Sequence, residues 1–171
     1  GGTSAMSGGM LWIPLNDQQA KHGVEDSFDE VVTYVDGLAD DGHLEPETFG
    51  AFLEEGPEML RWFEEKTPVK LRLFEGFPDY QSWAEGAKEF GSRSLDNDVF
   101  PFVELGSWAK WVNPPKTGWP RRTSMIEDYY SPGLSEEELA DREARDCRGQ
   151  GQALIGSLLK GVLDRNIPLH R

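Results

Sequence analysis

The chain opens with GGTSAMSGGMLWIPLN (residues 1–16), in which two pairs of glycines bracket a threonine and two serines. A backbone without Cβ atoms can approach a ligand closely, and successive exposed N–H groups form an anion-binding concavity. Hydroxyl groups beside them can donate hydrogen bonds to phosphate oxygens. The alternative is a flexible Gly/Ser-rich tail, with the true start at Met6 or Met10. The candidate ligand-contacting residues are Gly1, Gly2, Thr3, Ser4, Ser7, Gly8 and Gly9.

Size and charge limit the class of protein. At 171 residues, of which 37% are hydrophobic, the chain is long enough to bury a core, and one domain is the expectation. The formal net charge is −14, from 31 acidic and 17 basic residues. This balance argues against binding to nucleic acid or to anionic membranes, which require basic patches.

Cysteine and histidine content narrows the chemistry further. The single cysteine, Cys147, excludes an internal disulfide and a multi-cysteine metal site. The three histidines (His22, His43 and His170) are far apart, without metal-ligand spacing, so we expect no metal. No apolar stretch approaches the roughly 20 residues of a transmembrane helix, and no signal peptide is visible. We therefore expect no transmembrane segment and a cytoplasmic location.

Hydrophobic spacing predicts mainly helices around a small sheet. Ser27 and Glu30 form a capping box that predicts a helix from Phe28, and Ser135 with Glu138 predicts another as far as about Cys147. Between them, a helix from Pro46 should close at Gly56 and a new one should open at Pro57. The remaining pattern predicts a strand over 69–74 and an irregular excursion with one or two strands over 75–131. It also predicts a helix with an apolar stripe over 154–163 and a short strand over 167–170.

Several motifs, in a fixed order, resemble one family. The opening GGTSAMSGG followed by LWIPLND is similar to the segment after the second strand of FAD-dependent flavoproteins of the fumarate reductase/3-ketosteroid Δ1-dehydrogenase superfamily. The later motifs of the resemblance are Gly56-Pro57-Glu58-Met59 before Trp62, Thr67-Pro68-Val69, Gly76-Phe77-Pro78-Asp79-Tyr80, Gly91-Ser92-Arg93-Ser94-Leu95 and Gly149-Gln150-Gly151-Gln152-Ala153-Leu154. Residues 107–148 match least well.

The resemblance implies an α+β or α/β fold that forms a single partial FAD-binding domain. Residues 1–20 would contact FAD, residues 21–148 would form a helix and loop insertion, and residues 149–171 would supply the helix and strand that return to the FAD domain. The dinucleotide fingerprint G-x-G-x-x-G is absent from this sequence, so the chain resembles an internal part of a flavoprotein. Alone, we expect it to bind FAD weakly or not at all, because the helix N-terminus that holds the pyrophosphate is missing.

Tyr80 is the candidate catalytic residue. In 3-ketosteroid dehydrogenases, a tyrosine in a similar Pro-Asp-Tyr sequence supports the base that removes a proton from the steroid A ring, and a hydride then passes to the flavin. By resemblance Tyr80 takes that supporting role, since a tyrosine hydroxyl can act as acid or base when a partner tunes it. The alternative is a tyrosine packed at a turn with its hydroxyl in water. Tyr129 and Tyr130 do not match the other tyrosines of the family.

The implied activity is dehydrogenation or reduction of a carbon–carbon bond next to a carbonyl. Four tryptophans (Trp83, Trp108, Trp111 and Trp119) could line an apolar pocket for a steroid-like ketone or another enone, or could serve the core. Arg93, and separately Arg121 with Arg122, could contact an anionic group, which leaves a fumarate-type dicarboxylate substrate as an alternative. The alternative from another class is an inactive fragment or acidic interaction module, for which exposed apolar surface favours self-association.

Overall fold

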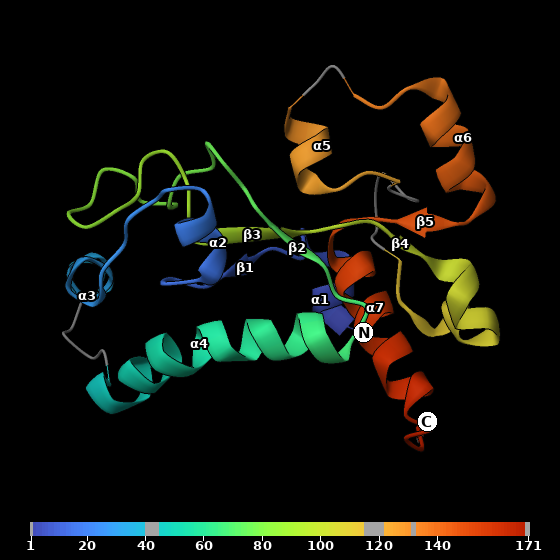
Figure 1. Cartoon of the computed structure of the whole chain (residues 1–171), viewed down its shortest axis with the longest axis horizontal. Helices are drawn as coiled ribbons and strands as arrows, with labels where there is room; N and C mark the ends of the chain where they lie inside the picture. Colours follow the sequence, from blue (N-terminus) through green and yellow to red (C-terminus); the bar gives the residue numbers. More distant parts are fainter. Residues whose placement is uncertain (1, 40–44, 115–121, 131–132, 170–171) are drawn as a thin grey trace. The chain divides into compact units, whose positions relative to one another are not determined.

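The computed structural model describes residues 2–39, 45–114, 122–130 and 133–169. It divides into two compact units, the first made of residues 1–10, 63–71 and 96–171 and the second of residues 11–62 and 72–95. The helices drawn in Figure 1 are α1 (Gly2–Met6), α2 (Asp17–Lys21), α3 (Phe28–Asp36), α4 (Pro46–Lys66), α5 (Met125–Tyr129), α6 (Glu136–Ala144) and α7 (Gln150–Asp164), with a 3₁₀ segment, η1 (Phe102–Trp111). The strands are β1 (Leu11–Trp12), β2 (Leu71–Leu73), β3 (Ser94–Asn97), β4 (Phe100–Pro101) and β5 (Cys147–Arg148).

Two small sheets accompany these helices, which confirms the predicted mixed fold. One sheet has the strand order β1-β3-β2, and its β1 and β3 are antiparallel, with Leu11 opposite Leu95. The other pairs β4 with β5 in antiparallel register, with Phe100 opposite Arg148.

Side-chain caps set the starts of four helices. Ser27 and Ser135 cap α3 and α6 by accepting hydrogen bonds from the backbone N–H groups of Glu30 and Glu138, which confirms both predicted helix starts. The reciprocal capping box forms at Ser135, whereas the Ser27 N–H donates to the Asp26 carboxylate at 3.1 Å. Two further capping boxes start α2 and α5 and were not predicted: Asn16 with Gln19, and Ser124 with Glu127. The same spacing of a cap residue and a Glu or Gln three positions later signals both of them in the sequence.

The predicted helix break at Gly56-Pro57 is wrong, because α4 continues through it. A proline inside a helix costs about 3 kcal/mol in an isolated peptide. Here the face that carries Leu53, Gly56, Pro57 and Leu60 is buried, and a Cβ on Gly56 would lie 3.1 Å from Ile13 Cγ2. Tertiary packing of this face outweighs the local preference for a break.

Three other boundaries differ from the sequence prediction. The region 75–131 contains strands, as expected, but also η1 and the helix α5. The helix that starts at Glu136 ends at Ala144, and Cys147 belongs to β5, because the backbone turns at Asp146 with φ +48°. The predicted last strand is absent over the described residues 167–169, and His170 lies outside them.

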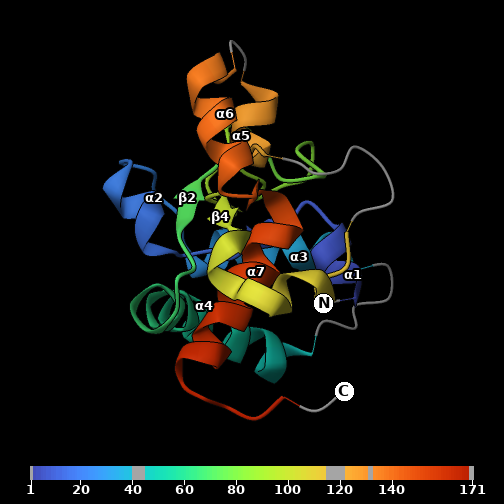
Figure 2. The same ribbon diagram turned by 90° about the vertical axis from the view of Figure 1, so that its right-hand side faces the viewer.

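The first unit packs around α7. Its buried core residues are Ala5, Phe100, Phe102, Leu105, Val112 and Ala153. A Cβ on Gly156 of α7 would lie within 3.0 Å of the rings of Phe100 and Phe102, so the missing side chain lets these rings pack on the helix. Figure 2 shows α5 beside α6, where the Arg142 and Glu127 side chains form an ion pair at 2.8 Å.

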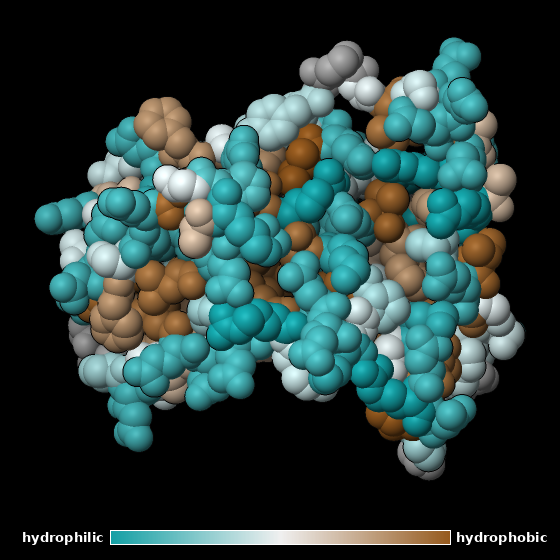
Figure 3. All heavy atoms as spheres, viewed as in Figure 1, coloured by the Kyte–Doolittle hydropathy of each residue, from teal (hydrophilic) through white to brown (hydrophobic). Residues whose placement is uncertain are grey.

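The second unit packs around the β1–β3 pair, with α3 and α4 contributing apolar side chains. Its fully or nearly fully buried side chains are Ile13, Val31, Tyr34, Leu53, Leu60, Leu73, Phe74 and Leu95. The sequence prediction of a half-buried strand is confirmed at β2, where Leu71 and Leu73 are buried and Arg72 is half-buried. Most of the face seen in Figure 3 is hydrophilic, as expected of so acidic a chain. Among the described residues, no helix combines the length and apolar character that a membrane crossing requires.

Candidate functional site

The glycine-rich opening forms a short helix and a tight turn. Gly2–Met6 is α1, and the chain then turns at Ser7, whose Oγ donates to the Ser4 carbonyl at 2.9 Å. The same Oγ accepts a hydrogen bond from the Gly9 N–H at 3.0 Å. The segment is therefore ordered by its own serine rather than being an extended tail.

Gly9 and Gly151 let this segment lie directly against the start of α7. Gly9 has φ +71°, and a Cβ on it would lie 2.4 Å from the Gly151 nitrogen. A Cβ on Gly151 would lie 2.0 Å from the Ser4 carbonyl oxygen. The Gly151 N–H donates to the Ser7 carbonyl at 3.1 Å, and the Asn97 side-chain amide donates to the Gly9 carbonyl. Figures 1 and 2 both show α1 beside α7.

The remaining candidate residues of the segment face outward. Gly2, Thr3, Ser4 and Ser7 are exposed, and no atom lies within 4 Å of a Cβ built on Gly2. Gly8 is half-buried, Gly9 is buried and Gly1 lies outside the described residues. Hydroxyl groups on exposed residues such as Thr3 and Ser4 can donate hydrogen bonds to phosphate or ribose oxygens. These two side chains are therefore the candidates for contact with a nucleotide, while Gly9 holds the segment on α7.

Tyr80 projects from the second unit into solvent. Its side chain is 86% exposed, and its ring lies 6.2 Å from that of Phe77 in an edge-to-face arrangement. Trp83 and Phe90, in the same loop, are each 81% exposed. Large aromatic side chains exposed in one loop are typical of a surface that contacts a ligand or partner.

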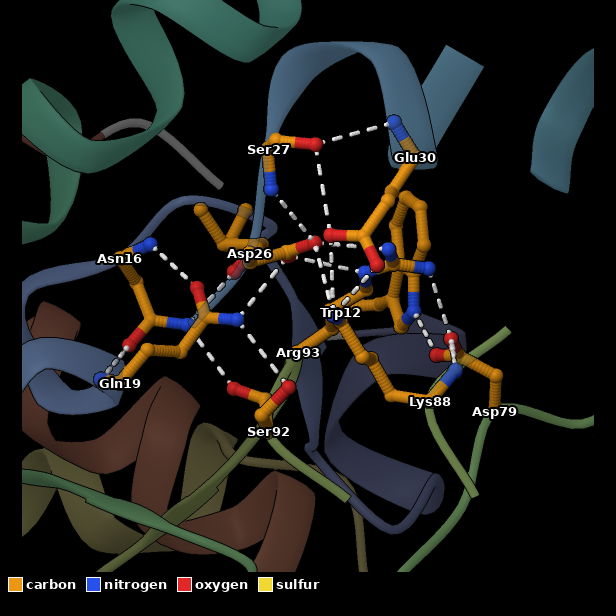
Figure 4. Close-up of polar contacts among 11 residues, drawn as sticks. Trp12, Asn16, Gln19, Asp26, Ser27, Glu30, Asp79, Lys88, Ser92 and Arg93 are labelled. Carbon is orange, nitrogen blue, oxygen red and sulfur yellow. Dashed lines mark hydrogen bonds and ion pairs between the residues drawn. The ribbon is translucent and has the colours of Figure 1, made fainter. Parts of the chain in front are cut away.

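The residue before Tyr80 is buried and firmly held. One oxygen of the Asp79 carboxylate accepts from Trp12 Nε1 at 2.6 Å. The other accepts from the Lys88 backbone N–H at 2.9 Å and from the Arg93 guanidinium at 2.8 Å (Figure 4). The Asp79 N–H in turn donates to the Lys88 carbonyl at 3.0 Å.

Arg93 is the centre of this arrangement. Its side chain is fully buried and donates two hydrogen bonds to Asp26, from Nε at 2.9 Å and from NH2 at 2.8 Å, in addition to the one to Asp79 (Figure 4). Its guanidinium carbon lies 5.5 Å from the centre of the Tyr34 ring and 6.0 Å from that of Trp12. We call Trp12, Asp26, Tyr34, Asp79 and Arg93 the Arg93 cluster.

The charges of the cluster stabilise each other. Burial alone would raise the pKa of Asp26, but hydrogen bonds from Arg93 and Gln19 and the positive charges of Arg93 and Lys88 outweigh it, so this pKa lies below its usual value. Burial acts to lower the pKa of Arg93, and Asp26 and Asp79 reverse that effect and raise it. Asp26 and Arg93 are therefore a buried ion pair in which each partner favours the charged form of the other.

The described arginines among the candidate residues form ion pairs with carboxylates of this chain. Arg93 binds carboxylates, but these are the chain's own Asp26 and Asp79. Arg122 pairs with Glu143 at 2.8 Å, and Arg121 lies outside the described residues.

The described tryptophans considered for an apolar pocket belong to both units. Trp83 belongs to the second unit, whereas Trp108 packs on the core of the first unit and Trp111 is exposed there. Trp119 lies outside the described residues. Within the described ranges, no group of three or more His, Cys, Asp or Glu residues is arranged to hold a metal ion.

Sequence reasoning missed the partners of Arg93. Asp26 was not singled out, although a carboxylate next to a helix cap and an arginine flanked by small residues are both compatible with a buried pair. The two residues are 67 positions apart, and no local pattern connects them. Gln19 was missed as well; its side-chain amide donates to Asp26 at 2.9 Å and to Ser92 Oγ at 3.0 Å.

Known proteins similar to this chain share one kind of chemistry. The chain is 33% identical over 186 residues to a 3-oxosteroid 1-dehydrogenase of Mycolicibacterium smegmatis, covering 99% of this chain and 32% of that protein. It is 30% identical over 168 residues to a 4-oxocyclohexanecarboxylate 2-dehydrogenase of Sinomonas cyclohexanicum, covering 95% of this chain and 28% of that protein.

A solved structure extends the likeness to the fold. The crystal structure of the 3-ketosteroid Δ1-dehydrogenase of Sterolibacterium denitrificans, in complex with 1,4-androstadiene-3,17-dione, matches with a TM-score of 0.85 at 28% identity. The match covers 99% of this chain and 33% of that one. The chain thus spans about a third of the length of the relatives it matches. The model of the FAD binding domain family matches residues 1–171. The chain therefore belongs to the FAD binding domain family.

Proposed function

We propose that this chain is part of an FAD-dependent oxidoreductase that dehydrogenates a carbon–carbon bond next to the carbonyl of a ring ketone. The observation that carries the proposal is the combination of a family match over residues 1–171 with relatives named for the dehydrogenation of oxosteroids and oxocyclohexanecarboxylates. These relatives differ in the rest of the substrate and share a ring ketone. The shared chemistry is what we assign to this chain.

The cofactor-contacting residues in this proposal are those of the opening segment, Gly1 to Ser4 and Ser7 to Gly9. The hydroxyl groups of Thr3 and Ser4 support it, because both residues are exposed and their hydroxyls can donate to phosphate or ribose oxygens. The contact of Gly9 with α7 holds these donors in place. When bound, FAD supplies the acceptor for the hydride that leaves the substrate. Residues 1–20 and 149–171 then belong to the cofactor-binding part, and residues 21–148 form an insertion.

Tyr80 is the residue of this chain that we assign to proton transfer. Its hydroxyl would hold or pass on the proton that leaves the carbon next to the carbonyl, in support of a base elsewhere in the enzyme. Its exposure supports this role, because the hydroxyl can reach a bound substrate. The exposed rings of Trp83 and Phe90 beside it in the loop suit an apolar ring system.

A ring ketone fits the second unit better than a dicarboxylate. A dicarboxylate site needs cationic groups that are available to the ligand. Arg93, the candidate arginine of the second unit, is fully buried and bonded to Asp26 and Asp79. We therefore place a fumarate-type substrate second.

The proposal is tested by assaying the FAD-loaded enzyme that carries this sequence with an artificial electron acceptor. A 3-oxosteroid, 4-oxocyclohexanecarboxylate and fumarate are compared, with the variants Tyr80→Phe and, as a matched control, Tyr129→Phe. We expect the enzyme to turn over a ring ketone. Tyr80→Phe should lower the turnover rate by about 100-fold or more, which is within the range of general acid–base contributions. Tyr129→Phe should keep the wild-type rate.

Other outcomes would contradict different parts of the proposal: the substrate, the role of Tyr80 or the enzymatic activity itself. Turnover of fumarate alone would reassign the substrate to a dicarboxylate. Ring-ketone turnover that is equal in Tyr80→Phe and Tyr129→Phe would remove Tyr80 from the site. Loss of the flavin bands on desalting, with no turnover of any substrate, would favour the inactive module.

A further inference from the structure

We propose that Arg93 and Tyr34 are positioning residues that fix the direction in which Tyr80 leaves the chain. The inference rests on the proposed function of Tyr80 and names the residues that make it effective. It rests on one observation: both residues next to the exposed Tyr80 are hydrogen-bonded to the Arg93 cluster. Asp79 is a member of that cluster, and the Gln81 N–H donates to Tyr34, another member.

The first tie lies on the N-terminal side of Tyr80. Asp79 is buried, and its carboxylate accepts three hydrogen bonds, from Trp12, from the Lys88 backbone and from Arg93, at 2.6–2.9 Å. Its backbone N–H is also used, in the bond to the Lys88 carbonyl. Neither the side chain nor the backbone of Asp79 can rotate without breaking these hydrogen bonds and leaving buried polar groups unsatisfied.

The second tie lies on the C-terminal side. The Gln81 N–H donates to the Tyr34 hydroxyl at 3.3 Å. Tyr34 is a buried residue of α3, and its ring lies against the Arg93 guanidinium at 5.5 Å, a cation–π distance. The peptide on each side of Tyr80 is therefore attached to a group that Arg93 contacts.

Between the two ties only the Tyr80 side chain is left to solvent. The loop 75–93 has no helix or strand, so it cannot set the direction of a side chain by regular backbone geometry. A reacting group must be held within a fraction of an ångström of its productive position, and a misplacement of 1 Å can cost about 100-fold in rate. The buried ion network gives the irregular loop 75–93 the rigidity that precise positioning of Tyr80 requires.

The test uses the FAD-loaded enzyme that carries this sequence and the ring ketone it turns over. Tyr34→Phe removes the hydroxyl that accepts from Gln81 and keeps the ring against Arg93. Ser92→Ala is the matched control, because it also removes one hydroxyl, the one that accepts from Gln19 at 3.0 Å, away from Gln81. Both variants are combined with Tyr80→Phe in a double-mutant cycle.

We expect Tyr34→Phe to lower kcat about tenfold with KM changed less than twofold, a loss within the range that misplacement of a reacting group produces. In the Tyr80→Phe background, the same substitution should have no further effect on kcat, because there is no hydroxyl left to position. Ser92→Ala should leave kcat unchanged in both backgrounds. As a second variant, Arg93→Lys keeps the charge but loses the two-pronged bond to Asp26, and its loss of kcat should also vanish in the Tyr80→Phe background.

The experiment distinguishes a failure of the positioning role from a failure of the proposed function. If Tyr80→Phe lowers kcat but Tyr34→Phe does not, or lowers it equally in both backgrounds, the positioning role is wrong and the proposed function stands. If Tyr80→Phe itself leaves kcat unchanged, the proposed role of Tyr80 is wrong and the positioning role falls with it. Melting temperatures of Tyr34→Phe and Ser92→Ala identify a loss of kcat that comes from unfolding.

Discussion

The α1–α7 contact of the first unit is made of backbone against backbone, whereas the Arg93 cluster of the second unit is made of charged and aromatic side chains. In the first, Gly9 and Gly151 leave out side chains so that two segments can touch. In the second, one arginine satisfies two buried carboxylates at once. Both arrangements hold a candidate functional segment in place. They should respond in opposite ways to substitution, one to an added methyl group and the other to a removed charge.

The largest effect should come from removing the charge at the centre of the cluster. Arg93→Met leaves Asp26 and Asp79 buried without their partner, which costs about 3–5 kcal/mol in free energy of unfolding. Arg61→Met is the control in the same unit, because its ion pair with Asp17 is solvent-exposed and worth at most about 1 kcal/mol. Denaturant unfolding followed by circular dichroism measures both. Equal losses in the two variants would mean that the cluster contributes no more than a surface pair.

The next effect tests the backbone contact of the first unit. Gly9→Ala places a methyl group where the backbone of Gln150 and Gly151 lies and forces an unfavourable φ, so we expect a loss of about 2–3 kcal/mol. Gly8→Ala is the matched control, because its Cβ would meet the Met125 side chain at ordinary van der Waals distances, 3.6 Å from the sulfur and 3.8 Å from Cγ. The same unfolding experiment compares the two. If Gly9→Ala is as stable as Gly8→Ala, the close contact does not hold the segment on α7.

Sequence reasoning predicted these two regions unequally. Gly9 and Gly151 both stand in glycine-rich motifs; from the sequence, Gly9 is assigned to ligand contact and Gly151 to the segment that returns to the FAD domain. The structure shows that Gly9 also packs on α7, a use that no local pattern reveals because its partner is 142 positions away (151 minus 9).

The helices show where local signals suffice. The capping box of Ser135 with Glu138 acts within one turn and is predicted correctly, whereas α4 crosses Gly56-Pro57 because Ile13, from a distant segment, packs on it. For the candidate site, Tyr80 could be proposed by resemblance, but its ties to Tyr34 and Arg93 required coordinates.

The pH dependence of stability should distinguish the cluster from the glycine contact. The pKa of Asp26 is lower in the folded chain than its usual 3.8, so folding favours the charged form. This contribution is complete above the unfolded-state pKa and is lost as the pH falls through the lower, folded-state pKa. As the pH falls below about 4, the free energy of unfolding of the wild type should decrease more steeply than that of Asp26→Asn. Parallel acid limbs would contradict the assignment, and Gly9→Ala should keep the wild-type slope.

The smallest effect should come from the turn that follows α1. Ser7→Ala removes the hydroxyl that donates to the Ser4 carbonyl and accepts from the Gly9 N–H, both at an exposed residue. Water can replace these bonds, so the loss should be about 0.5–1.5 kcal/mol. Hydrogen exchange at the Gly9 amide should become faster in this variant. A loss as large as that of Gly9→Ala would shift the main support of the segment from the glycine contact to the serine turn.

The proposed function requires that a ring ketone pass a hydride to the flavin of the enzyme that carries this sequence. Mixing the oxidised, FAD-loaded enzyme with a saturated 3-oxo ring ketone without oxygen, and following the visible flavin band, tests this transfer. We expect the band to bleach in a single turnover, the ring ketone to gain a conjugated double bond, and Tyr80→Phe to slow this step. A flavin band that stays unchanged while the ketone is bound would mean that no hydride is transferred and that the proposed function is wrong.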